Sequence, residues 1–146
     1  MEFSGVVEIQ AARAAVWAFV MDPERVGWCG PGVEAIEIVD ATHYRARAKV
    51  GIGVISARFV VDLELAEAVE PDRAVIRASG QAPGSAADAV GEITLTGAAA
   101  GPTTMAWTAT VAISGALASL GSRLIDNTAE KLIGETFACI RAQLEA

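Results

Sequence analysis

The sequence is poor in the residue types that most often carry catalysis or bind metals. It contains one histidine, one tyrosine and two cysteines among 146 residues, and aromatic residues make up only 5%. A histidine-rich metal site needs several imidazoles, and the sequence has neither a Gly-x-Ser-x-Gly motif nor a phosphate loop ending in Lys-Ser/Thr. We therefore expect no catalytic residues and no metal site, and binding is favoured over catalysis.

Positive charge is also scarce. The chain has 11 Lys and Arg against 18 Asp and Glu, which gives a net charge of −7. Nucleic acids and anionic lipid surfaces are usually bound through basic patches, so the total charge argues against both. No apolar run approaches the roughly 18 residues of a membrane span, and the N-terminus lacks the basic and apolar regions of a signal peptide. We expect a cytoplasmic protein without a nucleic-acid partner.

The two cysteines are Cys29 and Cys139. They are far apart in the sequence and have no metal-ligand spacing. This usage predicts two free thiols in a reducing compartment, although a disulfide stays open as the less favoured alternative.

The length of 146 residues predicts one domain, residues 1–146. Apolar and polar residues alternate in a period of two along seven segments, and this alternation predicts strands. Two short helical pieces follow the first strand, at 11–20 and from Asp22-Pro23-Glu24, where an acid precedes a proline. Residues 80–91 look loop-like at their start. The predicted strands are 2–10, 33–40, 43–50, 55–67, 73–79, 92–96 and 103–114.

Residues 115–146 form the one segment long enough for a dominant helix. At about 100° per residue, its first apolar set, around Leu120 and Leu124, is rotated well away from the second, which includes Phe137 and Ile140. The helix therefore either bends or has halves that face different surroundings. A sheet with one apolar face needs a cover, and this helix is the element that can supply it.

The inward positions of the predicted sheet are almost entirely apolar. By alternation Tyr44 is the one inward phenol, Glu67 the one inward carboxylate, and His43 points outward. Acid–base chemistry usually needs a positioned titratable group in the pocket. The interior is therefore suited to burying an apolar ligand.

Several short stretches resemble the CoxG family of carbon monoxide dehydrogenase subunits, within the START-like (SRPBCC) superfamily. The more specific ones are Cys-Gly-Pro-Gly at 29–32 and Gly-Ala-Leu-Ala-Ser-Leu-Gly-Ser-Arg at 115–123; the others are Phe3-Ser4-Gly5, Val16-Trp17, Asp22-Pro23-Glu24, Lys49-Val50-Gly51 and Gly80. The sequence departs from the family at Ile52, where relatives often have proline, and in the smaller number of glycines at 80–91. The resemblance implies an α+β helix-grip fold, in which a curved antiparallel sheet wraps around a long C-terminal helix.

The resemblance also implies a function. Members of the family are accessory proteins linked to recruiting a molybdenum hydroxylase, such as carbon monoxide dehydrogenase, to the cytoplasmic membrane and to handling its quinone acceptor. We expect a hydrophobic ligand, menaquinone, ubiquinone or another lipid, between sheet and helix, and a peripheral membrane contact. Some relatives continue into a tail proposed to meet the membrane, and we expect no such anchor within residues 1–146.

The candidate pocket residues are large or inward-facing, and the candidate mouth consists of loops with glycine or proline. Two other functions stay open. The first is a docking or membrane-recruitment module that uses the apolar stripe Ile133, Phe137, Ile140 and Leu144, although we slightly prefer the interpretation that this stripe covers the far end of the sheet. The second is a polyketide cyclase or aromatase that uses Tyr44, Glu67 or Cys29. The predicted pocket is Phe19, Trp28, Tyr44, Phe59, Trp107, Leu120, Leu124 and Thr128, and the predicted mouth is Pro31, Gly32, Gly51 and Gly53.

Overall fold

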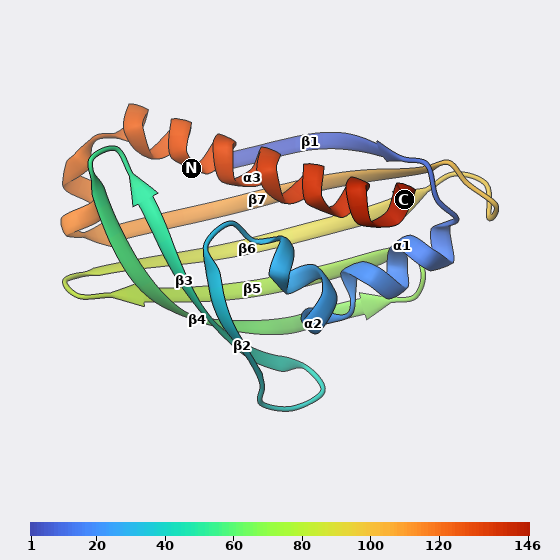
Figure 1. The fold of residues 1–146 in the computed structure, drawn as a ribbon, viewed down its shortest axis with the longest axis horizontal. Helices are drawn as coiled ribbons and strands as arrows, with labels where there is room; N and C mark the ends of the chain where they lie inside the picture. Colours follow the sequence, from blue (N-terminus) through green and yellow to red (C-terminus); the bar gives the residue numbers. More distant parts are fainter.

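The computed structural model describes residues 1–146 and consists of one seven-stranded sheet with helical segments on one side (Figure 1). All seven strands predicted from the alternation are present. They are β1 (Glu2–Ile9), β2 (Val33–Ile38), β3 (His43–Ile52), β4 (Ile55–Val69), β5 (Arg73–Ala82), β6 (Ser85–Thr96) and β7 (Thr103–Gly115). The helices and 3₁₀ turns are α1 (Arg13–Val20), α2 (Pro23–Val26), η1 (Gly27–Cys29), η2 (Ala116–Leu120) and α3 (Ser122–Glu145).

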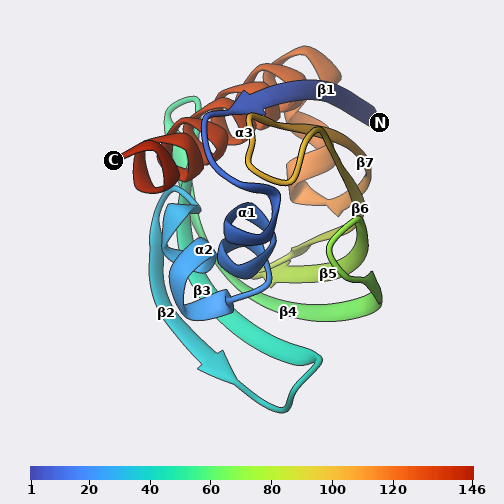
Figure 2. The same ribbon diagram turned by 90° about the vertical axis from the view of Figure 1, so that its right-hand side faces the viewer.

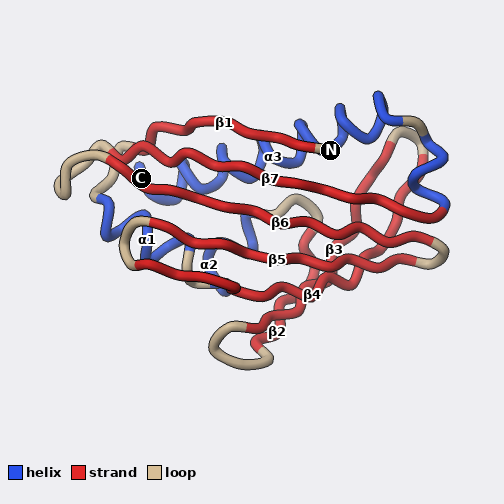
Figure 3. The backbone as a smooth tube through the Cα atoms, turned by 180° about the vertical axis from the view of Figure 1, so that it is seen from behind, coloured by secondary structure: helices blue, strands red, loops and turns tan.

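Every strand pairs antiparallel with its neighbours, in the order β1-β7-β6-β5-β4-β3-β2. Figure 2 shows the sheet curving around α1 and α2, with α3 bridging the side of β1 and the side of β3. Figure 3 shows the outer face of the sheet from behind, and the helices lie on the far side. This arrangement confirms the predicted α+β helix-grip architecture.

Local sequence explains where these elements form. In β1, Phe3, Gly5 and Val7 are half-buried and Ile9 is fully buried, while the residues that alternate with them are exposed, as expected for a strand with one apolar face. Helix α2 begins as predicted: Pro23 occupies its first turn and the Asp22 carboxylate accepts a hydrogen bond from the Glu24 amide at 3.0 Å.

The buried side chains form two separate clusters. The larger one joins α1 to the sheet and includes Ile9, Phe19 and Met105. The smaller one, Ile52, Phe59 and Leu117, lies where β3 ends and η2 begins. The total accessible surface is 8007 Å², whereas a folded chain of this mass exposes about 7,000 Å². The fold therefore leaves more surface exposed than a compact domain of this mass.

The C-terminal helix is shorter than predicted. Residues 116–120 form the 3₁₀ turn η2, Gly121 has a positive φ of 93°, and α3 begins only at Ser122. Gly121 adopts a backbone conformation that other residues avoid, so the chain changes direction there. The break places Leu120 in a separate element, whereas Leu124 lies in α3 together with the second apolar set. None of the helices has the length and apolar character needed to cross a bilayer.

The prediction of a loop starting at Gly80 was wrong. Strand β5 runs to Ala82, β6 starts at Ser85, and the connection is a turn at Pro83 and Gly84, where Gly84 has φ of 73°. The glycines and alanines here are strand residues that leave space on the inner face. Gly80 is buried beneath the side chains of Phe59 and Val61, 3.6 Å from the position that a Cβ would occupy.

The prediction of two free thiols was also wrong. Cys29 and Cys139 form a disulfide with a Cα–Cα distance of 5.4 Å, and it links η1 to α3. The two residues are 110 positions apart, so only the tertiary fold brings them together. The bond fastens the C-terminal half of α3 to the segment that follows α2.

Candidate ligand-binding site

An apolar cavity of about 110 Å³ lies between the α1–α2 segment and the inner face of β2–β5. Nine of its eleven lining residues are hydrophobic, so a water molecule inside would find few hydrogen-bond partners. A cavity of this kind takes an apolar group such as a ring or a short stretch of hydrocarbon. The lining residues are Val20, Met21, Pro23, Val26, Gly27, Ile36, Tyr44, Ala46, Leu63, Leu65 and Ile76.

Tyr44 supplies the one side-chain hydroxyl of this cavity. It is half-buried and points inward, as the alternation of β3 predicts. Its hydroxyl donates a hydrogen bond to the backbone carbonyl of Ala41 at 2.8 Å. No histidine, carboxylate or amine lines the cavity. The arrangement can bury an apolar group, and the phenol is already engaged in holding the β2–β3 turn.

Three other predicted pocket residues lie at the smaller cluster, where β3 ends and η2 begins. Phe59 is 9% exposed and belongs to the smaller cluster, and Leu120 and Leu124 pack against that cluster. Phe19 is 2% exposed within the larger cluster. The structure therefore places these four side chains in the packing of the two clusters, whereas Tyr44 lines the cavity beside the β2–β3 turn.

Trp107 lines a cleft of about 560 Å³ between the edge strand β1 and α3. Its ring lies 5.2 Å from the ring of Phe137, and Gly5 provides the space, because a Cβ at Gly5 would come within 2.9 Å of the indole. Trp28 lies apart from these residues on η1 and is 53% exposed. The two tryptophans therefore do not share one pocket.

The four predicted mouth residues do come together. Pro31, Gly32, Gly51 and Gly53 line one crevice of about 480 Å³, and Thr128 of α3 lines its opposite wall. This crevice is mainly polar; two of its eleven lining residues are hydrophobic. Thr128 uses its hydroxyl within α3, where it donates to the Leu124 carbonyl at 2.8 Å.

The apolar stripe on the second half of α3 faces the sheet. Ile140 is 3% exposed in the larger cluster, and Phe137 and Leu144 pack against that cluster. Ile133 lines the cleft between β1 and α3. The packing of Ile140, Phe137 and Leu144 supports the preferred interpretation, that this stripe covers the far end of the sheet, while Ile133 and Phe137 also line the cleft.

The prediction that Glu67 points inward was wrong. The register shifts between Leu65 and Glu67, so one extra residue in β4 turns the following side chains to the other face. Glu67 now pairs with Arg73 at 2.7 Å, and Arg73 also contacts Glu92 at 2.8 Å. Both hydrogen bonds raise the pKa of the Arg73 guanidinium. The alternation rule fails here because it assumes an unbroken pleat.

Most of the cavity wall was not predicted from the sequence. Leu63, Leu65 and Ile76 lie within the predicted strands 55–67 and 73–79, but their side chains are absent from the predicted pocket. Val26 and Gly27 carry no periodic signal, because α2 has only four residues. The cavity exists where this short helix lies over the small side chain of Ala46.

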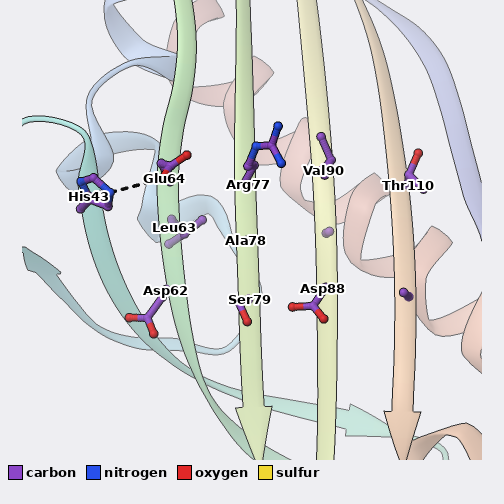
Figure 4. Close-up of a pocket in the computed structure, with 12 residues that line it drawn as sticks. His43, Asp62, Leu63, Glu64, Arg77, Ala78, Ser79, Asp88, Val90 and Thr110 are labelled. Atoms are coloured by element: carbon purple, nitrogen blue, oxygen red, sulfur yellow. Dashed lines mark ion pairs between the residues drawn. The ribbon is translucent and has the colours of Figure 1, made fainter.

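The outer face of the sheet carries a shallow hollow of about 500 Å³ (Figure 4). Polar side chains of both signs line it, including Asp62, Arg77 and Asp88. His43 lies here, on the exposed side as predicted, with Nε2 3.3 Å from the Glu64 carboxylate and Nδ1 2.9 Å from the Asp40 carboxylate. This hollow is open and charged, so it does not suit an apolar ligand.

A pH titration should reveal the contacts of His43 with Asp40 and Glu64. The hydrogen bond that the His43 imidazole donates to Asp40, followed by the weaker contributions of Glu64, raises the pKa of His43 above its ordinary value of 6.5. The stabilisation from the pair is therefore fully present below about pH 6.5 and is lost as pH rises through the folded pKa of His43. NMR titration of the imidazole should give a pKa above 6.5, and Asp40→Asn should lower it more than Glu64→Gln. An equal shift in both variants would contradict this assignment.

Comparison with known families gives a match over nearly the whole chain. The sequence profile of the CoxG family of carbon monoxide dehydrogenase subunits matches residues 5–145. No curated protein matches the chain.

Solved structures share the fold at low sequence identity. A conserved protein from Geobacillus kaustophilus has a TM-score of 0.92 and 23% identity, covering 99% of this chain and 95% of its own. The Zhui aromatase/cyclase from Streptomyces sp. R1128 has a TM-score of 0.74 and 15% identity, covering 99% and 93%. A START superfamily protein from Mycobacterium smegmatis has a TM-score of 0.70 and 14% identity, covering 99% and 97%. At these identities the likeness shows the fold alone.

Proposed function

The chain belongs to the CoxG family of carbon monoxide dehydrogenase subunits, and from this premise we propose that it is an accessory protein that carries an isoprenoid quinone. The ligand, menaquinone or ubiquinone, occupies the space between the sheet and the helices. The protein passes it between the membrane and a molybdenum hydroxylase, such as carbon monoxide dehydrogenase. The apolar side chains that line the interior suit this class of ligand.

The observation that carries the proposal is the apolar cavity beneath α2. Its wall offers hydrocarbon from nine residues and one hydroxyl that is already bonded to Ala41. Burial of apolar surface stabilises a complex by about 25 cal/mol per Å², so a quinone ring or a prenyl unit that fills the cavity supplies affinity without any charged partner. Beyond the cavity, the half-buried positions Ala48, Ala78 and Ala89 carry only a methyl side chain.

The alternative function is enzymatic, because the solved structures with this fold include aromatase/cyclases. Such an enzyme would need a proton donor or acceptor at the ligand. The cavity offers only Tyr44, whose hydroxyl donates to Ala41, and Glu67 faces outward. Cys29 is in the disulfide. These residues thus support binding over acid–base catalysis. An activity on cyclic polyketides that Tyr44→Phe abolishes in a folded protein would favour the enzyme instead.

The direct test is organic extraction of the protein purified from its native host, followed by mass spectrometry. We expect one quinone per chain. Extraction of another lipid in the same amount would keep the carrier function and change its cargo. Purified protein that also fails to retain menaquinone added in detergent would overturn the proposal.

A cavity-filling variant should locate the ligand. In Ala46→Phe the added ring projects into the cavity that Ala46 lines, so we expect at least about tenfold less quinone after purification. Ala112→Phe is the matched control, because Ala112 is exposed on the outer face. Equal retention in the two variants would place the ligand elsewhere in the molecule.

A further inference from the structure

Strand β1 is an edge of the sheet, and β7 is the one strand that pairs with it (Figure 3). Met1 and Val111 exchange two backbone hydrogen bonds of 2.8 Å, one in each direction. In an antiparallel pair such bonds alternate from one residue to the next, and the pairing of β1 has no register shift. The odd-numbered residues of β1 therefore bond to β7, and the even-numbered ones direct their N–H and C=O groups to the free side. These are Glu2, Ser4, Val6 and Glu8.

The free side of β1 faces helix α3. Just beyond the strand, the Gln10 amide donates a hydrogen bond to the Glu145 carboxylate of α3 at 2.9 Å. No hydrogen bond joins the free-side backbone groups of Ser4, Val6 and Glu8 to the rest of the protein. Such a row of unpaired backbone groups is the template to which another extended chain can pair.

The β1–α3 cleft runs along this unpaired edge. Residues 2–7 of β1 line it without interruption, and Ile133, Gly134 and Phe137 of α3 line the opposite wall. The ring of Trp107, which packs against the ring of Phe137, adds an aromatic surface. A Cβ at Gly134 would meet no atom within 4 Å, so the helix leaves this wall open. The cleft therefore combines a wall of backbone hydrogen-bonding groups with an apolar wall.

The charged side chains along this edge are acidic. Glu2 and Glu130 line the cleft, and no lysine or arginine lines it. Glu8 extends from the same strand and accepts a hydrogen bond from the Gln10 side chain at 3.0 Å. The amino group of Met1 is directed to the other side of the strand, where it bonds to β7. An occupant with basic side chains is complementary to this edge.

A second copy of the chain is a poor occupant. If two β1 strands pair antiparallel over their whole length, centred on Gly5, Glu2 of each copy lies opposite Glu8 of the other. Like charges directly opposite one another destabilise a strand pair. Each copy also has a net charge of −7. The charge pattern therefore favours a basic chain of another protein.

We propose that the β1–α3 cleft binds an extended basic segment of a partner protein, which adds to β1 as a further antiparallel strand. In this mode of recognition, main-chain hydrogen bonds supply affinity and alternate side chains supply specificity. The side chains opposite Phe3, Gly5 and Val7 enter the cleft and are apolar. Those opposite Glu2 and Glu8 are lysine or arginine. This binding site goes beyond quinone carriage and does not depend on it.

A synthetic peptide with this pattern, acetyl-Lys-Val-Thr-Leu-Thr-Val-Lys-amide, tests the proposal. We expect it to bind the wild-type protein in isothermal titration calorimetry. In an NMR titration the amides of Ser4, Val6 and Glu8 should shift most, because they gain hydrogen-bond acceptors. N-methylation of both threonines removes donors that face β1 and should weaken binding at least about tenfold. Replacing both lysines by glutamate should weaken it at least about fivefold at low salt.

A variant of α3 tests the position of the peptide. In Gly134→Leu the new side chain enters the open space of the cleft, so we expect at least about tenfold weaker binding. Leucine is a better helix former than glycine, so the melting temperature should not fall. Ala142→Leu is the matched control, because Ala142 is exposed on α3 outside the cleft, and this variant should bind as the wild type does.

Three results would overturn the proposal. The first is a wild-type protein that does not bind the peptide, or binds the N-methylated form equally well. The second is equal binding by Gly134→Leu and Ala142→Leu. The third is a wild-type dimer in sedimentation velocity that Gly134→Leu dissociates, because a second copy would then occupy the edge. Quinone retention should be unchanged in Gly134→Leu, since the apolar cavity lies at α2, so each proposal can fail without the other.

Discussion

Loss of the disulfide should produce one of the two largest stability changes in this protein. Replacing Cys29 and Cys139 together by alanine is expected to lower the free energy of unfolding by roughly 4 kcal/mol, because the bond closes a loop of 110 residues and restricts the unfolded chain. Denaturant titration followed by circular dichroism measures the change, and the melting temperature should fall by roughly 10 °C.

The controls separate the bond from the side chains. Reduction of the wild-type protein removes the bond and leaves both thiols, so it should reproduce most of the loss. Cys29→Ala and Cys139→Ala should each cost about as much as the double variant, since either one breaks the same bond. Stability that does not respond to a reductant would contradict the disulfide.

The disulfide also connects stability to the site. Cys29 follows Gly27, which lines the apolar cavity, and it precedes Pro31 and Gly32, which line the candidate mouth. Cys139 lies on α3, whose N-terminal half forms the other wall of the mouth. Reduction should therefore lower quinone retention as well as stability, because both walls lose their covalent connection.

The sequence predicts the sheet well because apolar and polar residues alternate within each strand that has one apolar face, and this alternation is visible in the local sequence. Tyr44 and His43 lie on the faces that alternation assigns, and all seven strands are present. The rule fails at Glu67, where an extra residue in β4 resets the alternation. It also fails at 80–91, because glycine and alanine resemble loop residues when their role is to leave space on an inner face.

The candidate site is less predictable because it depends on tertiary contacts. The cavity forms where the four residues of α2 lie over four strands, and so short a helix has no periodicity. The helix break at Gly121 depends on a backbone angle that no local pattern of residues specifies. The mouth residues, in contrast, were predicted from local sequence and do line one crevice, because adjacent strands bring their ends together.

Glycine in the mouth should prove to be fixed rather than mobile. Gly32 has φ of 78°, and a Cβ there would overlap the carbonyl oxygen of Lys49. Its own carbonyl accepts a hydrogen bond from the Lys49 amide at 2.9 Å. Gly32→Ala should therefore lower the free energy of unfolding by about 2–4 kcal/mol, as measured by denaturant titration.

Gly51 is the matched control in the same crevice. It has no positive φ, and a Cβ there would meet no atom within 4 Å. Gly51→Ala should leave stability unchanged or raise it by about 0.5 kcal/mol, because alanine restricts the unfolded chain. If both variants are equally stable, the contact between Gly32 and Lys49 does not hold the mouth. If only Gly32→Ala is destabilised, the β2–β3 wall is rigid, and any opening must come from α3, the wall that the disulfide restrains.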